Sequence, residues 1–390
     1  MSPLLQLMAS AVALMMAMGI GRFALTPQMP RLIAEGQFDL TAGGLVAAAN
    51  YLGYVLGAVD GMFARHPHQV RLRLHAGLWL CVLLTLASWA ANGFWSHLLL
   101  RFGTGVASAW ALVMLTSLSQ HVASSHGRAR LGALVFAGPG VGIAVTGFLA
   151  LGAHLLSLDS AALWLVYSVA ALVMLLAVLP WLPRAHLLTP APSTAAAQAH
   201  PRQRGIARLA VVYALYGIGY ILPATFLSQM ASQQFQGQWL ADLFWPGFGL
   251  AAALGVVIVS LRGPGRTSVW LTATLWLQAL GVLACLLGGG IGLGLGVLLC
   301  GAPFLACMQL VMQRSRELAP HATQRNAGLL TACFALGQLS GPLLAALSNH
   351  FSGGLQPALL LAAAGLGVAG LLVATSRSDQ RAAEQLATPV

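Results

Sequence analysis

The sequence predicts an all-α membrane protein with twelve transmembrane helices in two pseudo-symmetric six-helix bundles. The first reason is composition, since 58% of the 390 residues are hydrophobic and only 7% are charged, whereas soluble domains carry about 25% charged residues. The second is that apolar runs of roughly 20 residues, long enough to cross a bilayer, recur along the whole chain. The third is that the two halves repeat short motifs in the same order.

The apolar runs define twelve spans. Many contain Gly or Pro, which helices in lipid tolerate because neighbouring helices satisfy the freed backbone groups. The first run is too long for a cleavable signal peptide and leads directly into further runs. The predicted spans are residues 4–28, 40–63, 72–92, 96–120, 130–153, 160–182, 206–230, 238–261, 267–287, 291–313, 325–348 and 355–376.

The basic residues predict how the chain is oriented. All 19 are Arg, and sixteen of them lie in alternate loops and the C-terminal tail, on one side of the membrane. Only Arg31 lies in a loop on the other side, while Arg22 and Arg101 lie within spans. By the positive-inside rule, both termini should be cytoplasmic, in a cell inner membrane. We therefore interpret the net charge of +11 as a topology signal, and expect no nucleic-acid partner.

The longest connection between spans predicts the domain organisation. Residues 183–205 contain Pro190, Pro192, Pro201 and a stretch of Ala, Ser, Thr and Gln, a composition typical of a flexible linker. We expect this linker to be cytoplasmic and to join an N-terminal bundle, residues 1–182, to a C-terminal bundle, residues 206–376. Residues 377–390 would form a cytoplasmic tail.

Matching motifs indicate that the halves are repeats. Gly19-Ile20-Gly21 recurs as Gly217-Ile218-Gly219, 198 positions later. Two further pairs of segments are offset by 203 positions. These pairs are Asp39-Leu40 with Asp242-Leu243, and Gly138-Pro139 with Gly341-Pro342. Parallel repeats of this kind place a binding site at their interface, near the middle of the bilayer.

Several local motifs resemble those of the major facilitator superfamily. Arg101 to Gly105 is similar to its Arg-x-x-x-Gly motif, and Gly138 to Gly142 to the Gly-Pro-x-x-Gly signature of exporters. Segments 19–27 and 216–225 resemble the YbfB/YjiJ-type branch. The resemblance implies a transporter fold that works by alternating access, lined by the first, fourth, seventh and tenth helices, but it implies no particular cargo.

One motif of that superfamily departs from its usual pattern here. The loop after the second span should carry a Gly-x-x-x-Asp-Arg/Lys-x-Gly-x-Arg/Lys motif. Instead, Asp60 is followed by Arg65, Arg71 and Arg73 at different spacings. The resemblance therefore does not carry over the usual Asp–Arg latch between the two bundles.

Charges within spans are the most informative side chains. Arg at the centre of a transmembrane helix costs about 2.5–3.5 kcal/mol on insertion scales, so it normally faces a cavity or a partner. Arg22 and Arg101 have no Asp or Glu at comparable depth, which predicts an anionic substrate, since a carboxylate fits the guanidinium fork. Two alternatives stay open: Arg22 could pair with Glu35 or Asp39, and Arg101 could bind carbonyls of a neighbouring helix.

Polar and aromatic side chains complete the predicted substrate site. Three of the six Tyr share one face of the seventh span, and the repeat places this face opposite Met15, Met18 and Arg22. Alternatively, the three Tyr could form an aromatic packing stripe. The amide side chains within spans, including Gln278, could instead form interhelical hydrogen bonds. The predicted substrate-binding residues are Arg22, Tyr213, Tyr216, Tyr220, Met18, Asn50, Gln309 and Gln338.

A second set is predicted to act in coupling or structure: Arg101, Asp60, Gly138, Pro139, Gly341 and Pro342. The Gly-Pro pairs would either allow tight packing or act as flexing elements. His66 and His68 lack companions for a metal site, and the five Cys fall inside apolar runs as small core residues. No motif of an enzyme or of a phosphate-binding loop is recognisable.

These observations predict a transporter of a small solute, without metal or other cofactor, working as a monomer. The preferred cargo is an organic anion, driven by a proton gradient or by its own gradient. One alternative is a proton-coupled exporter of amphipathic toxic compounds. Another is a membrane sensor or scaffold that transports nothing.

Overall fold

The computed structural model describes residues 2–64, 66–127, 129–184, 202–236, 238–262, 266–319 and 323–387. In this part of the chain all regular structure is helical, and twelve helical segments are long and apolar enough to cross a membrane. The prediction of twelve transmembrane helices is therefore confirmed. Of the predicted linker, residues 185–201 lie outside the described residues.

The helices of the first half form six spans. Their bounds are α1 Pro3–Leu14, η1 Met15–Arg22, α2 Leu25–Ala34, α3 Leu40–Met62, α4 Pro67–Ala87, η2 Ser88–Ala90, α5 Gly93–Ser125, α6 Ala129–Leu134, α7 Ala137–Leu155, α8 Ser160–Val178 and η3 Leu179–Trp181.

The helices of the second half form the other six spans. Their bounds are α9 Arg202–Gln234, η5 Trp239–Leu243, α10 Phe244–Leu261, α11 Thr267–Leu286, α12 Gly289–Leu318, α13 Thr323–Ser352 and α14 Gln356–Ala387. The last helix continues past the predicted end of its span at residue 376.

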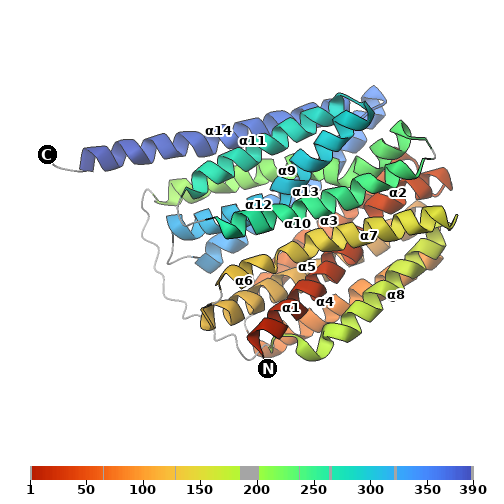
Figure 1. The fold of residues 1–390 in the computed structure, drawn as a ribbon, viewed down its shortest axis with the longest axis horizontal. Helices are drawn as coiled ribbons and strands as arrows, with labels where there is room; N and C mark the ends of the chain where they lie inside the picture. Colours follow the sequence, from red (N-terminus) through yellow and green to blue (C-terminus); the bar gives the residue numbers. More distant parts are fainter. Residues whose placement is uncertain are drawn as a thin grey trace.

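All spans run roughly parallel or antiparallel in one elongated bundle (Figure 1). The helix α1 begins and α14 ends toward the same end of this bundle, which we call the terminal side. The other end, where α2 ends and α3 begins, is the opposite side. In Figure 1 the helices α9 to α14 fill the upper part of the bundle, and most of the first half lies below them.

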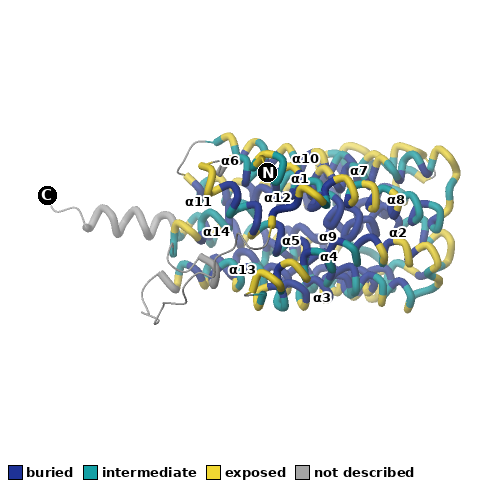
Figure 2. Tube along the Cα trace, turned by 90° about the horizontal axis from the view of Figure 1, so that it is seen from below, coloured by how far each residue is buried: buried dark blue, intermediate teal, exposed yellow. Residues whose placement is uncertain are grey.

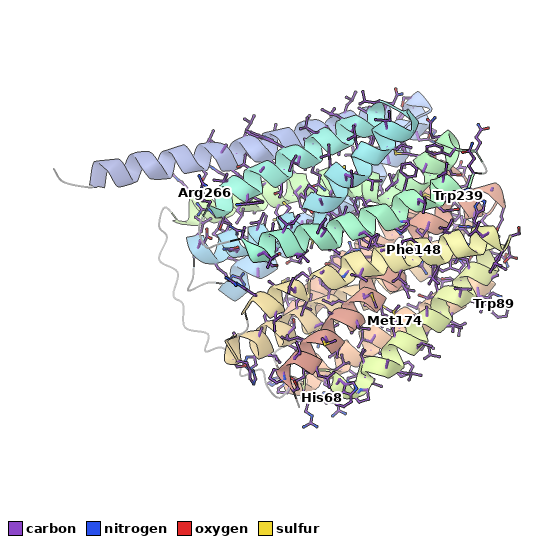
Figure 3. The ribbon with its side chains drawn as sticks, viewed as in Figure 1. His68, Trp89, Phe148, Met174, Trp239 and Arg266 are labelled. Atoms are coloured by element: carbon purple, nitrogen blue, oxygen red, sulfur yellow. The ribbon has the colours of Figure 1, made fainter. Side chains whose placement is uncertain are left out.

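The surface of the bundle suits a lipid environment. Buried segments run through the interior and exposed ones lie along the rim (Figure 2). Phe148, which is 49% exposed, and Met174 lie between the two ends, while Trp89 and Trp239 lie near the opposite side (Figure 3). Trp is enriched at membrane–water interfaces because its ring is apolar and its N–H is polar.

The first span differs most from the prediction. It ends at Ala34 instead of residue 28, and it is interrupted by the π-helical segment η1 and a turn at Phe23 and Ala24. Pro27 lies in the first turn of α2, where no helical hydrogen bond needs its missing N–H, so Pro27 allows a new helix to start there. The span Pro3–Ala34 extends beyond the predicted residues 4–28, so Arg22 lies nearer its middle than predicted.

The two halves meet along two helix pairs, α3 with α13 and α7 with α10. Small residues bring the backbones together at both. A Cβ atom on Gly140 of α7 would lie 2.7 Å from the Ala253 nitrogen and 2.9 Å from the Gly249 oxygen. A Cβ on Gly44 of α3 would lie 3.2 Å from the Pro342 oxygen.

The repeated Gly-Pro pairs therefore lie in the helices that join the halves. Gly138 and Pro139 begin α7, after a turn that separates it from α6. Gly341 and Pro342 lie inside α13, and the Pro342 carbonyl is the group that faces Gly44. The two glycines pack within their own halves, since a Cβ on Gly138 would lie 2.3 Å from the Ala11 oxygen of α1 and a Cβ on Gly341 would lie 2.1 Å from the Ile221 side chain of α9.

We expect Gly140→Ala to destabilise the protein, because the added methyl group would push α7 and α10 apart. Overpacking of a close contact typically costs about 1–3 kcal/mol. Thermal unfolding of the purified protein in detergent measures this effect.

The matched control is Gly152→Ala, on the same helix, where an added Cβ meets nothing within 4 Å. Its stability should stay the same or rise, since Ala favours helix over Gly by about 1 kcal/mol. Equal unfolding temperatures for the two variants would show that the α7–α10 contact does not require Gly140.

Candidate functional site

A buried chain of polar side chains crosses between the halves at mid-span. Arg22, at the end of η1, is only 3% exposed. Its Nη2 atom donates a hydrogen bond of 2.9 Å to the side-chain oxygen of Gln338 in α13. The Gln338 amide nitrogen in turn donates to the hydroxyl oxygen of Tyr220 in α9. One positive charge of the first half is thus bound to two neutral groups of the second.

Aromatic ring faces supply the other contacts of Arg22. Its guanidinium carbon lies 3.6 Å from the ring centre of Tyr54 and 5.2 Å from that of Tyr51, both in α3. Ring faces carry partial negative charge and attract cations.

Glu35 accepts hydrogen bonds from Ser160. Within the described residues, no carboxylate therefore neutralises Arg22.

Asp39 also has a different partner from Arg22. It accepts the backbone N–H of Ala42 at 2.7 Å and caps α3. The alternative in which Arg22 pairs with Glu35 or Asp39 is therefore not the arrangement in the structure.

The three tyrosines of α9 form a stack. Tyr213 and Tyr216 have ring centres 5.8 Å apart, and Tyr216 and Tyr220 5.1 Å apart. Phe334 of α13 and Phe304 of α12 extend the stack, at 4.6 Å from Tyr213 and Tyr220 respectively. All five rings are buried. Tyr220 belongs to the polar chain of Arg22, whereas Tyr213 and Tyr216 lie further along α9 toward the terminal side.

Some predicted site residues form hydrogen bonds within one half instead. The Asn50 amide donates to the Arg101 carbonyl at 2.9 Å and to the Thr104 hydroxyl at 3.1 Å, tying α3 to α5. Gln309 donates to the Ser260 hydroxyl at 3.2 Å, tying α12 to α10. A polar side chain in lipid binds the nearest helix that offers an acceptor. Met18, 5% exposed, lies in η1 one turn before Arg22.

The predicted coupling residues also have partners within the first half. Arg101 donates to the Ser88 hydroxyl at 2.7 Å and lies 4.7 Å from the Trp164 ring centre. Asp60 forms two hydrogen bonds with Arg73, of 2.7 and 3.0 Å, and accepts the Trp110 indole N–H at 2.8 Å. Asp60 therefore ties α3 to α4 and α5, and its described partners include no residue of the second half.

The structure is closed on the opposite side. Every residue from Met16 to Met29 and from Gly219 to Gln229 is buried, so these segments are enclosed on all sides. Polar contacts between the halves accompany this closure. They are Thr26 with the Ala224 carbonyl at 3.0 Å, Tyr51 with Thr225 at 3.2 Å, Trp245 with Thr146 at 3.1 Å and Asn349 with Thr41 at 2.9 Å.

A contact between a histidine and a carboxylate adds to this closure. His154 Nδ1, at the end of α7, lies 2.8 Å from the carboxylate of Asp242 in η5. Arg31 of α2 interacts electrostatically with the same carboxylate and donates to the Ala150 carbonyl at 2.9 Å. Asp39, the repeat equivalent of Asp242, caps its helix, and its partner in the described part of the chain is Ala42. Among the described residues, the second copy of this Asp therefore has an interdomain partner that the first lacks.

Sequence reasoning missed several of these residues. Tyr51 and Tyr54 were detectable, since they stand three residues apart in a span and therefore share a helix face. The pairing of His154 with Asp242, and the stacking of Phe304 and Phe334 on the tyrosines, join residues that only the fold brings together.

Two six-helix halves around a buried polar chain at mid-span define a multi-pass membrane transport protein. The chain belongs to the major facilitator superfamily, in the family described as "Uncharacterised MFS-type transporter YbfB", whose profile matches residues 14–374. The resemblance seen in the sequence is therefore confirmed. No curated protein matches the chain. Among solved structures it is similar to the crystal structure of the human organic anion transporter MFSD10 (TETRAN).

That similarity concerns the fold. Sequence identity is 17%, the TM-score is 0.65, and the match covers 96% of this chain and 100% of MFSD10.

We expect Asp242→Asn to loosen the closure of the opposite side, because His154 and Arg31 lose their common carboxylate. The pair is partly exposed, with side chains 35% and 17% accessible, and such pairs contribute about 0.2–1 kcal/mol. A Cys placed at Ala224, in a background without native Cys, should then react with a thiol reagent up to about fivefold faster.

Asp39→Asn is the control, since this Asp lies on the same side but, among the described residues, bonds within its own helix end. Equal labelling rates in the parent and in Asp242→Asn would mean that the His154–Asp242 contact does not hold the halves together.

Proposed function

We propose that this protein carries a small organic anion across the membrane by alternating access. The observation that carries the proposal is Arg22, a buried positive charge at mid-span, on the interface of the two halves, with only neutral partners. Residues 1–182 and 206–376 would rock about this site as two bundles, joined by the linker 183–205, within one monomer.

The chemistry of Arg22 favours a carboxylate. A buried charge without a counter-charge is costly, while a well-paired one is tolerated. The guanidinium fork matches the two oxygens of a carboxylate. The Arg22 Nε atom has no hydrogen-bond partner in the described part of the chain, so the guanidinium has a donor left for a ligand. The Gln338 amide and the Tyr220 hydroxyl, now bonded to one another, can turn to share the same ligand.

The surrounding rings favour a cargo with an apolar body. Tyr220, Phe304 and Phe334 of the second half lie in one stack beside the polar chain, and Tyr54, in the same half as Arg22, covers the Arg22 guanidinium. The name of MFSD10 also refers to organic anions, but at 17% identity that likeness extends to the fold alone. The anion proposal therefore depends on Arg22.

We also propose that the structure represents the state in which the side of the protein facing away from the cytoplasm is closed. The sixteen Arg in loops and tail favour a cytoplasmic location for the terminal side, and the contacts of Thr26, Tyr51 and His154 across the interface belong to the opposite side. Opening that side requires these short contacts to break, while the α3–α13 and α7–α10 pairs remain as pivots.

Substitutions of Arg22 test the cargo. Arg22→Lys keeps the charge but loses the fork, so uptake of a carboxylate into proteoliposomes should fall by roughly tenfold, a loss typical of about 1.4 kcal/mol. Arg22→Ala should reduce it further, with the protein still folded in detergent. Tyr220→Phe should have a milder effect, because Gln338 still binds Arg22 directly.

Two variants serve as controls. Tyr216→Phe removes a hydroxyl bonded to the Phe304 carbonyl, outside the Arg22 chain, and Gln309→Leu removes an amide bonded to Ser260. Both should transport like the parent. If the purified protein binds cationic or neutral lipophilic compounds, and Arg22→Ala binds them as well as the parent, the anion proposal is wrong and an exporter of amphipathic compounds replaces it.

Reporter fusions test the orientation. A phosphatase that is active only outside the cytoplasm should be inactive after Val390 and active when inserted between Gly353 and Gly354, in the turn between α13 and α14. The reverse pattern would contradict the positive-inside assignment.

A further inference from the structure

A second buried arginine lies away from the interface of the halves. Arg101 of α5 is 0% exposed. Its Nη2 donates to the Ser88 hydroxyl at 2.7 Å, and its guanidinium carbon lies 4.7 Å from the ring centre of Trp164 in α8. The Nε and Nη1 atoms have no hydrogen-bond partner among the described residues. The charge thus has one neutral hydrogen bond and one ring contact.

More donors without partners surround this arginine. His97 lies one turn earlier on α5, is 1% exposed, and neither of its ring nitrogens has a partner in the described part of the molecule. The indole nitrogen of Trp164, also 1% exposed, is equally unpaired there. Phe38 covers His97 edge-on, with ring centres 5.6 Å apart. Two helices of one half, α5 and α8, thus contribute these unpaired ring and guanidinium nitrogens, next to the Ser88 hydroxyl of η2.

The chemistry of these groups specifies what could bind among them. Arg and the Trp indole are donors only, while neutral His supplies one N–H and one uncharged acceptor nitrogen. The buried Cys81 thiol is only a weak acceptor. A buried charge needs a counter-charge or several hydrogen bonds. The missing partner is therefore an acceptor with negative charge.

The surroundings restrict its size. Arg101, His97, Trp164 and Ser88 are all at most 1% exposed, and the contacts of Arg101 lie within the first half. A cargo that moves between the halves would have to meet groups of both, as at Arg22. Only a very small ion suits an enclosed cluster in one half.

We propose that Arg101, Trp164 and His97 bind a halide ion, chloride in the cell, as a fixed counter-ion of the N-terminal bundle. The ion accepts hydrogen bonds from the Arg101 guanidinium, the Trp164 indole and one His97 nitrogen, and it holds α5 to α8. It is separate from the cargo at Arg22 and does not move during transport.

Thermal unfolding of the purified full-length protein in detergent tests this site. Sodium chloride and sodium bromide should raise the unfolding temperature by at least about 2 °C over sodium methanesulfonate at equal ionic strength, since a ligand of the folded state stabilises it. The shift should persist in Arg22→Ala, which removes the proposed cargo site. Crystals soaked in bromide should show an anomalous peak beside Arg101.

Trp164→Phe provides a variant that keeps an aromatic ring at this position and loses the indole N–H together with part of the ring volume. It should weaken the apparent bromide affinity by roughly tenfold, as expected for one hydrogen bond to a charged group. Trp110→Phe is the matched control, because its indole donates to Asp60 instead. It should leave the affinity unchanged.

Three results would overturn the proposal. One is equal unfolding temperatures in halide and methanesulfonate. Another is a halide shift that disappears in Arg22→Ala, which would place the ion at the interface. The third is density beside Arg101 without an anomalous bromide signal, which would identify water.

Discussion

Polar groups inside a bilayer must find partners within the protein, and most of this structure follows from that requirement. Lipid tails offer no hydrogen bonds, so each unsatisfied group costs several kcal/mol. Asn50 ties α3 to α5, Gln278 binds the Cys300 carbonyl between α11 and α12, and Gln309 ties α12 to α10. These bonds fix neighbouring helices within each half. Arg22 and Arg101 are the side chains for which such neutral partners do not suffice.

The interface between the halves is built differently from their interiors. Gly140 and Gly44 allow backbones to touch at the two helix pairs, so close packing provides most of the contact there. Several of the hydrogen bonds across the interface involve a short Thr side chain, such as Thr26 and Thr225. Interhelical hydrogen bonds in membranes are worth about 0.6 kcal/mol on average. An interface of this kind can separate on one side at low cost while its pivots stay packed.

Much of the fold could be predicted from the sequence, because apolar runs and Arg counts are properties of single segments. The repeat offset also placed Tyr220 opposite Arg22, and the structure links them through Gln338. The break in the first span was not predictable in the same way. Gly19 and Gly21 permit a wider turn, but the tertiary contacts of η1 with α7, α5 and α4 accompany it.

The partners of individual polar residues were harder to predict. Asn50 and Gln309 look the same in sequence as Gln338, yet only Gln338 reaches the other half. Which neighbour an amide meets depends on helix rotation, and periodicity alone does not determine rotation when a helix is apolar on all sides. For the same reason His154 gave no sign that it would meet Asp242 across the interface.

The π-helical form of η1 allows this segment to change its hydrogen-bond register. The Phe23 N–H binds the carbonyl of Met18, five residues back, at 3.0 Å. Moving each N–H in η1 to the carbonyl four residues back would convert the segment to an α-helix without losing a hydrogen bond. Each shift of the hydrogen-bond register by one residue rotates the residues that follow by roughly 100° about the helix axis. Arg22 stands at the end of η1, so its direction is tied to the register of the segment before it. A rotation within one helix can therefore reorient the guanidinium even when neither bundle has tilted.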